Sequence, residues 1–199
     1  MVNLADRYTA KGNKKLPKTT WIFNSGTATN CPSRKLGLCQ CSDKCYAMKA
    51  ERQYKNVLPY RQAQTEVTRE VDAADFAGML LIASKRKRVN ILNKFRFNES
   101  GDFYSQKQLN WFAALCGKLK RAGIVSYGYT ARTDLDLTLL IKNAFVNVSN
   151  DLNKWTDTGA NRFKAVKAYT DKNLKCAGDC RICSICSKAK GKTIEVEIH

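Results

Sequence analysis

Short runs in which hydrophobic and polar positions alternate recur along most of the chain. Runs rich in β-branched and aromatic residues predict strands, and a polar turn follows each run. Four such strands are expected, at residues 19–24, 94–98, 124–130 and 144–149. A further alternating run at 193–199 indicates an edge strand at the end of the chain.

The segments between these strands carry apolar residues at helical spacing. Asp72 is a suitable N-cap for a helix over 73–87. Ser105 and Gln108 form a capping-box pattern that opens a helix over 106–121. Further helices are expected at 45–57, 60–71 and 134–142, and residues 161–170 fit either a helix or a strand.

The alternation of strands and helices with short connections predicts right-handed βαβ units and a mainly parallel sheet. The expected fold class is therefore α/β, as a partial (β/α) barrel or a small open sheet, because four strands are too few for an eight-stranded barrel. Three regions are expected: a basic flexible arm at 1–18, an α/β partial-barrel domain at 19–170, and a cysteine-rich C-terminal segment at 171–199.

Charge and hydropathy narrow the possible functions. The chain of 199 residues has 35 Lys and Arg against 17 Asp and Glu, so a net charge of +18 raises the chance of a nucleic-acid partner. No apolar run approaches the ~20 residues of a membrane span, and no secretory signal is visible, so a cytoplasmic protein is expected. The only histidine is His199, so neither a folded histidine base nor a histidine metal ligand is expected.

Eight of the nine cysteines fall in two compact groups. Grouped cysteines in a reducing compartment typically bind metal or perform redox chemistry. The remaining one, Cys116, shares the apolar face of the helix expected at 106–121 and is interpreted as a core residue. The first cysteine block consists of Cys31, Cys39, Cys41 and Cys45, and the tail block consists of Cys176, Cys180, Cys183 and Cys186.

The spacing of the tail block, C-x3-C-x2-C-x2-C, favours an iron-sulfur cluster, most simply 4Fe-4S. Zinc is the alternative cofactor, although structural zinc usually takes two well-separated cysteine pairs. In the first block, Cys39 and Cys41 are too close in sequence to be expected on one small ion together, so one of them could be a spectator. The two blocks could hold two centres, or share one if the tail folded back over the strand ends.

Each expected strand ends in a polar segment, and parallel strands bring such ends to one edge of a sheet, where ligands collect. We expect the first cysteine block to lie at this edge as well. The candidate substrate-facing residues are Glu99, Asp102, Tyr129 and Arg132. The carboxylates would orient or bind substrate and the arginine would hold a phosphate or carboxylate, whereas turn capping is the simpler role for the carboxylates.

Several motifs follow one another in an order that resembles a known family. They are TWIFN at 20–24, Cys31-Pro32, CYA at 45–47, KAERQY at 49–54, NVLP at 56–59, SGDFYS at 100–105, YGYTAR at 127–132 and the tail block. Together, over about residues 19–187, they resemble the phage-encoded gene-product-eighty-eight family. The resemblance implies a radical-SAM-like partial barrel with cysteine-bound iron-sulfur, in the host cytoplasm.

The cysteine spacing departs from that of radical SAM enzymes. Their C-x3-C-x2-C motif follows the first strand, but here the position after Cys41 and Cys45 is occupied by Met48. The same spacing appears only in the tail block. SAM is therefore a less supported cofactor than iron-sulfur or zinc.

Three functions remain open at this point. The first is an iron-sulfur oxidoreductase or transferase with redox or SAM-related chemistry. The second is a nucleic-acid-binding protein with structural zinc or cluster sites. Its candidate phosphate contacts are the run Lys85, Arg86, Lys87 and Arg88, together with the basic residues at 118–121 and 188–192. The third is an electron carrier or cluster-based regulator whose basic surface meets an acidic redox partner.

Overall fold

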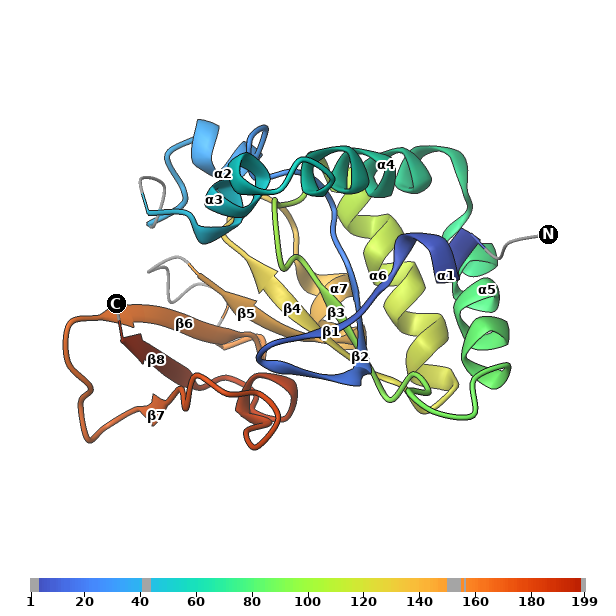
Figure 1. Cartoon of the computed structure of the whole chain (residues 1–199). Helices are drawn as coiled ribbons and strands as arrows, with labels where there is room; N and C mark the ends of the chain where they lie inside the picture. Colours follow the sequence, from blue (N-terminus) through green and yellow to red (C-terminus); the bar gives the residue numbers. More distant parts are fainter. Residues whose placement is uncertain (1–3, 41–43, 150–154, 156, 198–199) are drawn as a thin grey trace.

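A single sheet of eight strands forms the centre of the molecule, in the order β1-β2-β3-β4-β5-β6-β8-β7 (Figure 1). The computed structural model describes residues 4–40, 44–149, 155 and 157–197. β1 pairs antiparallel with β2, and the other described pairs are parallel. The strands are β1 Ala10–Asn13, β2 Leu16–Phe23, β3 Lys94–Phe97, β4 Val125–Thr130, β5 Phe145–Val148, β6 Asn161–Val166, β7 Leu174–Lys175 and β8 Thr193–Glu197.

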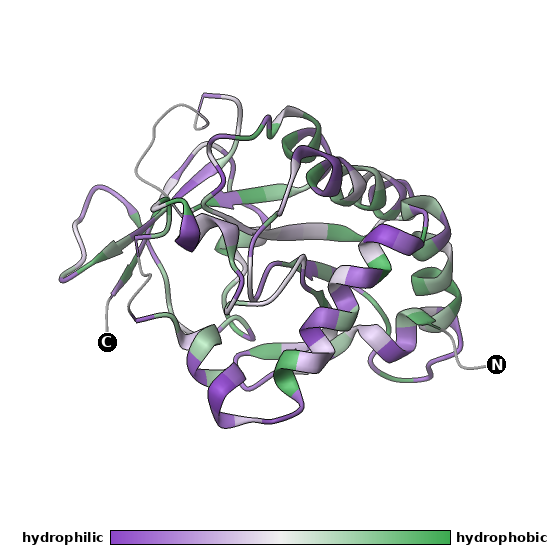
Figure 2. Ribbon diagram, turned by 90° about the horizontal axis from the view of Figure 1, so that it is seen from above, coloured by the Kyte–Doolittle hydropathy of each residue, from purple (hydrophilic) through white to green (hydrophobic). Residues whose placement is uncertain are grey.

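Helices α5, α6 and α7 pack side by side, and α6 contacts both of the others. They lie on one face of the sheet, and Figure 2 shows hydrophobic and hydrophilic positions alternating along the helices. The described helices are α1 Leu4–Tyr8, α2 Pro32–Lys35, α3 Tyr46–Gln53, α4 Val57–Glu70, α5 Ala73–Lys85, α6 Gln106–Arg121 and α7 Thr138–Asn143, with a short 3-10 helix at Ile185–Ser187. None of these helices combines the length and apolarity that crossing a membrane would need.

The predicted helix starts are confirmed where a cap residue marked them. The carboxylate of Asp72 accepts hydrogen bonds from two backbone N–H groups in the first turn of α5. The hydroxyl of Ser105 accepts one from the N–H of Gln108 at the start of α6. α4 begins earlier than expected, at Val57, because Pro59 falls in the first turn, where a proline removes no helical hydrogen bond.

The main core lies between the sheet and these helices. Phe23 and Phe97 reach it from the strands, and Phe112 meets them from α6 with ring centroids 5.8 and 6.1 Å away. Gly128 allows the ring of Phe97 to pack against the backbone of β4, because a Cβ at this position would lie 2.2 Å from a ring carbon of Phe97. Cys116 is fully buried in the same core, as expected.

The opposite face of the sheet is the one against which the tail block lies. We call it the tail face. The strand register places alternate residues of neighbouring strands on it, including Thr20, Lys94, Tyr127 and Tyr129. Ile22, Leu16 and Tyr127 form a small second core there, against which Cys180 and Cys186 pack.

The two ends of the chain differ from the expectation. Residues 4–13, expected to belong to a flexible arm, form α1 and β1, and β2 already begins at Leu16. The run at 193–199 does form a strand, but β8 is inserted between β6 and β7, so the two-residue β7 is the edge. Residues 161–166 are the strand β6. The sheet is mostly parallel and open, the second of the two expected architectures.

Candidate metal centre

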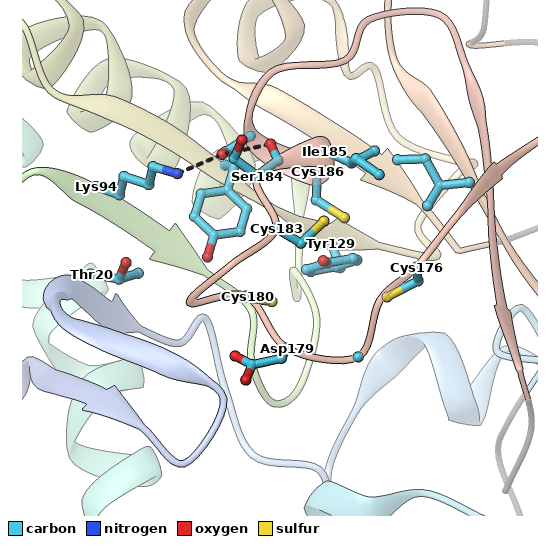
Figure 3. A pocket seen from close by; sticks show the side chains of 14 residues that line it. Thr20, Lys94, Tyr129, Cys176, Asp179, Cys180, Cys183, Ser184, Ile185 and Cys186 are labelled. Atoms are coloured by element: carbon cyan, nitrogen blue, oxygen red, sulfur yellow. Dashed lines mark hydrogen bonds between the residues drawn. The ribbon is translucent and has the colours of Figure 1, made fainter.

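The four cysteines of the tail block line one pocket on the tail face (Figure 3). The cavity has a volume of about 40 Å³, which exceeds the roughly 10–15 Å³ that one water molecule requires. The strands contribute Thr20, Lys94, Tyr127, Tyr129 and Ile194 to its walls. A sulfur-rimmed cavity therefore forms between the sheet and the loop at residues 176–192, which connects β7 to β8 and which we call the tail loop.

Two buried asparagines hold the far end of the tail loop. The amide of Asn147, on β5, donates to the carbonyl of Cys186 at 3.1 Å. Asn161, on β6, donates to the carbonyl of Ala189 at 2.8 Å and to the side-chain oxygen of Asn147 at 3.1 Å. Because both asparagine side chains are buried, leaving either unpaired would cost about 1–3 kcal/mol, which fixes the loop on the sheet.

Backbone contacts hold the near end of the same loop. The N–H of Cys176 donates to the carbonyl of Glu195 at 2.8 Å, and that of Cys180 donates to the carbonyl of Lys15 at 3.0 Å. At the far end of the loop, one side-chain contact is added: the ammonium of Lys94 donates to the hydroxyl of Ser187 at 3.0 Å, and both residues line the pocket. The cysteines are therefore positioned both by β8 and by the turn between β1 and β2, which lie at opposite ends of the sheet.

A half-buried cation lies close to the tail block. Arg96 points to the tail face, its guanidinium carbon is 5.1 Å from the ring centre of Tyr129, and its buried Nε has no hydrogen-bond partner. Burial raises the pKa of Cys180, and the charge of Arg96 opposes that rise. Burial raises the pKa of Cys186 to about 11. Cys180 and Cys186 are therefore protonated at neutral pH, and a metal must displace their protons when it binds.

The donor set can be compared with what each metal needs. In this conformation no group of three or more His, Cys, Asp or Glu side chains among the described residues could hold a single metal ion. In a four-iron cluster the four thiolates are spread over a cluster rather than gathered on one ion. The tail block supplies four thiols around a cavity, on different sides of Tyr129 in Figure 3, so it fits a cluster in donor type and number.

The first cysteine block lies elsewhere. Cys31 directly precedes α2 and Cys45 directly precedes α3, and neither they nor Cys39 line the tail pocket. Cys41 lies outside the described residues. Burial raises the pKa of Cys31 to about 11, and the nearby carboxylate of Asp102 adds to the rise. The described parts of the two blocks therefore do not share a site.

The first block does lie at the edge formed by the strand ends, as predicted. Ser33, in α2, donates to the carboxylate of Asp102 at 2.6 Å, and Thr130 at the end of β4 donates at 2.7 Å. The N–H of Ala131 donates at 2.7 Å to the same carboxylate, which is 4% exposed. Burial raises the pKa of Asp102 in spite of these bonds. Asp102 thus joins the first block to the strand ends.

The other candidate catalytic residues also have internal partners. Arg132 donates from Nε and Nη2 to the two oxygens of Asp134, both at 2.8 Å, and from Nη1 to the carbonyl of Phe103. Glu99 accepts a hydrogen bond from the side chain of Asn13. Tyr129 alone of the four lines the tail pocket. A catalytic role for them stays a prediction.

Sequence reasoning missed a buried ion pair behind the first block. Glu51 of α3 and Arg61 of α4 pair at 2.8 Å, with side chains 1% and 9% exposed. Glu51 also accepts from the N–H groups of Ala28 at 2.7 Å and Thr29 at 2.8 Å, just before Cys31. Burial acts to raise the pKa of Glu51, but these donors outweigh it and hold the pKa below its ordinary value.

Arg96, Asn147 and Asn161 were missed for a different reason. Each is a polar residue inside a strand, at a position that alternation assigns to a solvent-exposed face. The available signal was the residue type, because asparagine is disfavoured in strands and its presence there suggests a specific hydrogen-bonding role. The basic run lies at the C-terminal end of its helix, as expected: Lys85 ends α5, and Arg86 to Arg88 follow it, all exposed. Its contact with phosphates stays a prediction.

Comparison with known proteins yields one match. A family model described as gene product 88 matches residues 3–153, which include the first cysteine block and end before the tail block. Neither the curated proteins nor the solved structures contain a match.

Proposed function

The chain belongs to the gene product 88 family, and from that premise we propose that it is an iron-sulfur protein whose tail block holds one cluster on the tail face. The family match ends before the tail block. Support for a cluster therefore comes from the geometry of the tail rather than from family membership. The observation that carries the proposal is the placement of four cysteines around one cavity.

The tail loop is held in place by contacts that need no metal. Asn147 and Asn161 bind its carbonyls, and Lys15 and Glu195 bind its N–H groups. Such outer contacts orient ligands and tune a metal centre. A loop fixed in this way favours a specific centre over adventitious metal capture by loose thiols.

The charge around the cavity also suits a cluster. Four thiolates bring negative charge into a half-buried site, and an opposite charge nearby stabilises it. Arg96 supplies that charge, since no carboxylate of the described residues forms an ion pair with it. Its buried Nε is otherwise a cost to the fold, which a negatively charged occupant would offset.

The number of thiols favours electron transfer over substrate chemistry. When four cysteines are available, all metal positions can be filled by protein ligands, as in closed structural sites, whereas catalytic sites keep one position open. We therefore place an electron carrier or cluster-based regulator ahead of a redox or SAM-dependent enzyme. In the enzyme reading, Glu99, Asp102 and Arg132 would have to exchange their present partners for substrate.

Zinc on the same thiols is the alternative, and metal analysis separates the two. The protein is purified without oxygen, and iron, acid-labile sulfide, zinc and the visible spectrum are measured. We expect iron and sulfide in nearly equal amounts and a brown protein. A colourless protein with stoichiometric zinc would overturn the cluster and leave a structural zinc site.

Point variants test which thiols carry the metal. Cys183→Ser should lower the iron and sulfide content, because it removes one of the four thiolates on which metal affinity depends. Cys116→Ala is the matched control, since Cys116 is buried in the main core away from the tail pocket, and it should keep full metal content. The reverse pattern would refute the ligand assignment.

A further inference from the structure

Three helix ends meet at the edge where the parallel strands begin, on the helix-covered face of the sheet rather than on the tail face. α5, α6 and α7 each lead into the next parallel strand, so their last turns lie beside the N-terminal ends of β3, β4 and β5. The ends of α5 and α6 lie together at the lower right of Figure 1. Lys120, at the end of α6, donates to the carbonyl of Lys142, at the end of α7, at 2.7 Å. The three ends therefore form one continuous edge.

This edge is strongly positive. We call it the basic edge, and its eight exposed cations are Lys85, Arg86, Lys87, Arg88, Lys118, Lys120, Arg121 and Lys142. The segments that build it, residues 76–98, 103–133 and 137–149, contain no Asp or Glu at all. Among the described residues, Asp6 is the one carboxylate that pairs with these cations, at 3.1 Å from Lys87. The positive charge of this edge is thus almost uncompensated.

Helix dipoles do not account for so many cations. A cation in the last turn of a helix gains about 0.3–1 kcal/mol from the dipole, and the effect fades within that turn. One cation at each end would therefore suffice. Lys87 and Arg88 lie beyond the last turn of α5, where the dipole gives little. The surplus indicates an external polyanion.

We propose that the basic edge binds double-stranded nucleic acid through its phosphates. Neighbouring helices pack about 8–10 Å apart, so the three ends span about 20 Å, a length over which a duplex carries roughly ten phosphate charges. Single-strand binders stack bases on exposed aromatic rings. The large exposed aromatic residues of the described chain are Tyr46 and Tyr54, which belong to α3 and its C-cap at the other end of the sheet. Phosphate contact without stacking fits a duplex.

This surface is independent of the proposed cluster. None of the eight cations lines the tail pocket, and their removal leaves all nine cysteines in place. Metal content and nucleic-acid affinity are therefore separable measurements. A protein without a cluster could still bind a duplex at the basic edge, and the reverse also holds.

The experiment measures affinity for a labelled DNA duplex of about 20 base pairs, and for the single strand of the same length, as a function of salt. The test variant combines Lys85→Gln, Arg86→Gln, Lys118→Gln and Arg121→Gln, four exposed positions whose side chains form no hydrogen bond or ion pair with the part of the chain that the structure describes. The control variant combines Lys35→Gln, Lys49→Gln, Arg52→Gln and Lys55→Gln, which are exposed cations on and beside α2 and α3. Both variants remove four positive charges, and the control variant additionally removes one long hydrogen bond, from Lys35 to the side chain of Asn30 at 3.5 Å.

If all eight cations contact phosphates, the slope of log affinity against log salt is about −7 for the wild type and about −3.5 for the test variant. The control variant should keep the wild-type slope within about one unit. Arg86→Lys with Arg121→Lys keeps the charge and should keep the slope. Equal loss in both quadruple variants, tighter binding of the single strand, or no duplex binding at about 50 mM salt would each overturn the proposal.

Discussion

The two cysteine blocks place the same residue type in opposite electrostatic surroundings. In the first block, Cys31 lies near the buried carboxylate of Asp102, which disfavours a thiolate. In the tail block, the charge of Arg96 favours a thiolate at Cys180, while burial and the nearby Asp179 oppose it and keep the pKa of Cys180 raised. The comparison shows that two blocks with the same number of cysteines meet charges of opposite sign. The nearest buried charge has to agree with the charge of the ligand.

The blocks also differ in what their hydrogen bonds leave free. Around the first block, Glu51 and Asp102 accept bonds from the backbone and from hydroxyl groups that flank Cys31, and no pocket among those described includes these thiols. Around the tail block, Asn147 takes up a carbonyl and leaves the sulfur atoms facing a cavity. The segment around the first block is thus held by internal hydrogen bonds, whereas the thiols of the tail block face a cavity that could hold a ligand.

The largest expected difference between the blocks is in metal content. Cys180→Ser with Cys186→Ser should abolish iron binding, because metal ligation contributes on the order of 10 kcal/mol in comparable thiolate sites. Cys31→Ser with Cys39→Ser should leave most of the iron in place. Iron and sulfide per protein molecule give the answer. Equal losses from the two pairs would mean that the blocks act on one centre.

The next largest effect concerns the ion pair behind the first block. Glu51→Gln leaves Arg61 buried without its partner, so the free energy of unfolding should fall by about 3–5 kcal/mol in urea titrations. Glu66→Gln is the control, because Glu66 pairs with Arg69 on the exposed side of α4 and should cost less than about 1 kcal/mol. Tail-block iron should be retained in both folded variants. A loss below about 1 kcal/mol for Glu51→Gln would show that the Glu51–Arg61 ion pair contributes little to stability.

The same ion pair should make the stability of the protein fall as the pH is lowered. The pKa of Glu51 is lower in the folded protein than its ordinary value of about 4.3. Its contribution is therefore fully present above the unfolded pKa and is lost as pH falls through the folded pKa. The stability gap between the wild type and Glu51→Gln should narrow below about pH 4, as measured by urea titrations at several pH values. A constant gap would contradict the assignment.

The smallest expected effect is that of Arg96→Met, which should favour the metal-free protein and disfavour the form with metal in the tail pocket. Arg96→Met removes a half-buried charge that has no ion-pair partner among the described residues, so the metal-free protein should gain about 1 kcal/mol of stability. The metal-loaded form should instead lose metal faster to a chelator, because a compensating charge is gone. Thermal melting of the metal-free protein and metal release rates give the two signs.

Arg162→Met is the matched control for that experiment. Arg162 is on β6, next in sequence to Asn161, so the register turns it away from the tail face. It should leave metal release unchanged. If Arg96→Met destabilised the metal-free protein and left metal release unchanged, Arg96 would be a packing residue and the contrast between the blocks would lose its electrostatic basis.

The sequence by itself determined the elements whose signals are local. The cap residues Asp72 and Ser105 marked the starts of α5 and α6, because a cap bonds to its own first turn. Alternation identified β3, β4 and β5, and the chain order made them parallel. The placement of Asp102 beside the first block also followed from chain order, since parallel strands end at one edge.

Only the tertiary structure decided where the ends of the chain went. Residues 10–13 read as a polar arm because their pairing with β2 depends on a turn and not on their own hydropathy. β8 looked like an edge strand, yet it lies between β6 and β7, because the two-residue β7 has too short a pattern to be recognised from sequence.

The difference between the two cysteine blocks was likewise beyond the sequence. Their spacings describe which thiols are neighbours along the chain, but the charge that each block meets comes from a residue far away in sequence. Arg96 reaches Cys180 only because β3 lies under the tail loop, and Asp102 reaches Cys31 only because α2 folds over the strand ends. Local periodicity carries no information about such contacts, since the Coulomb energy between two charges depends on their separation in space.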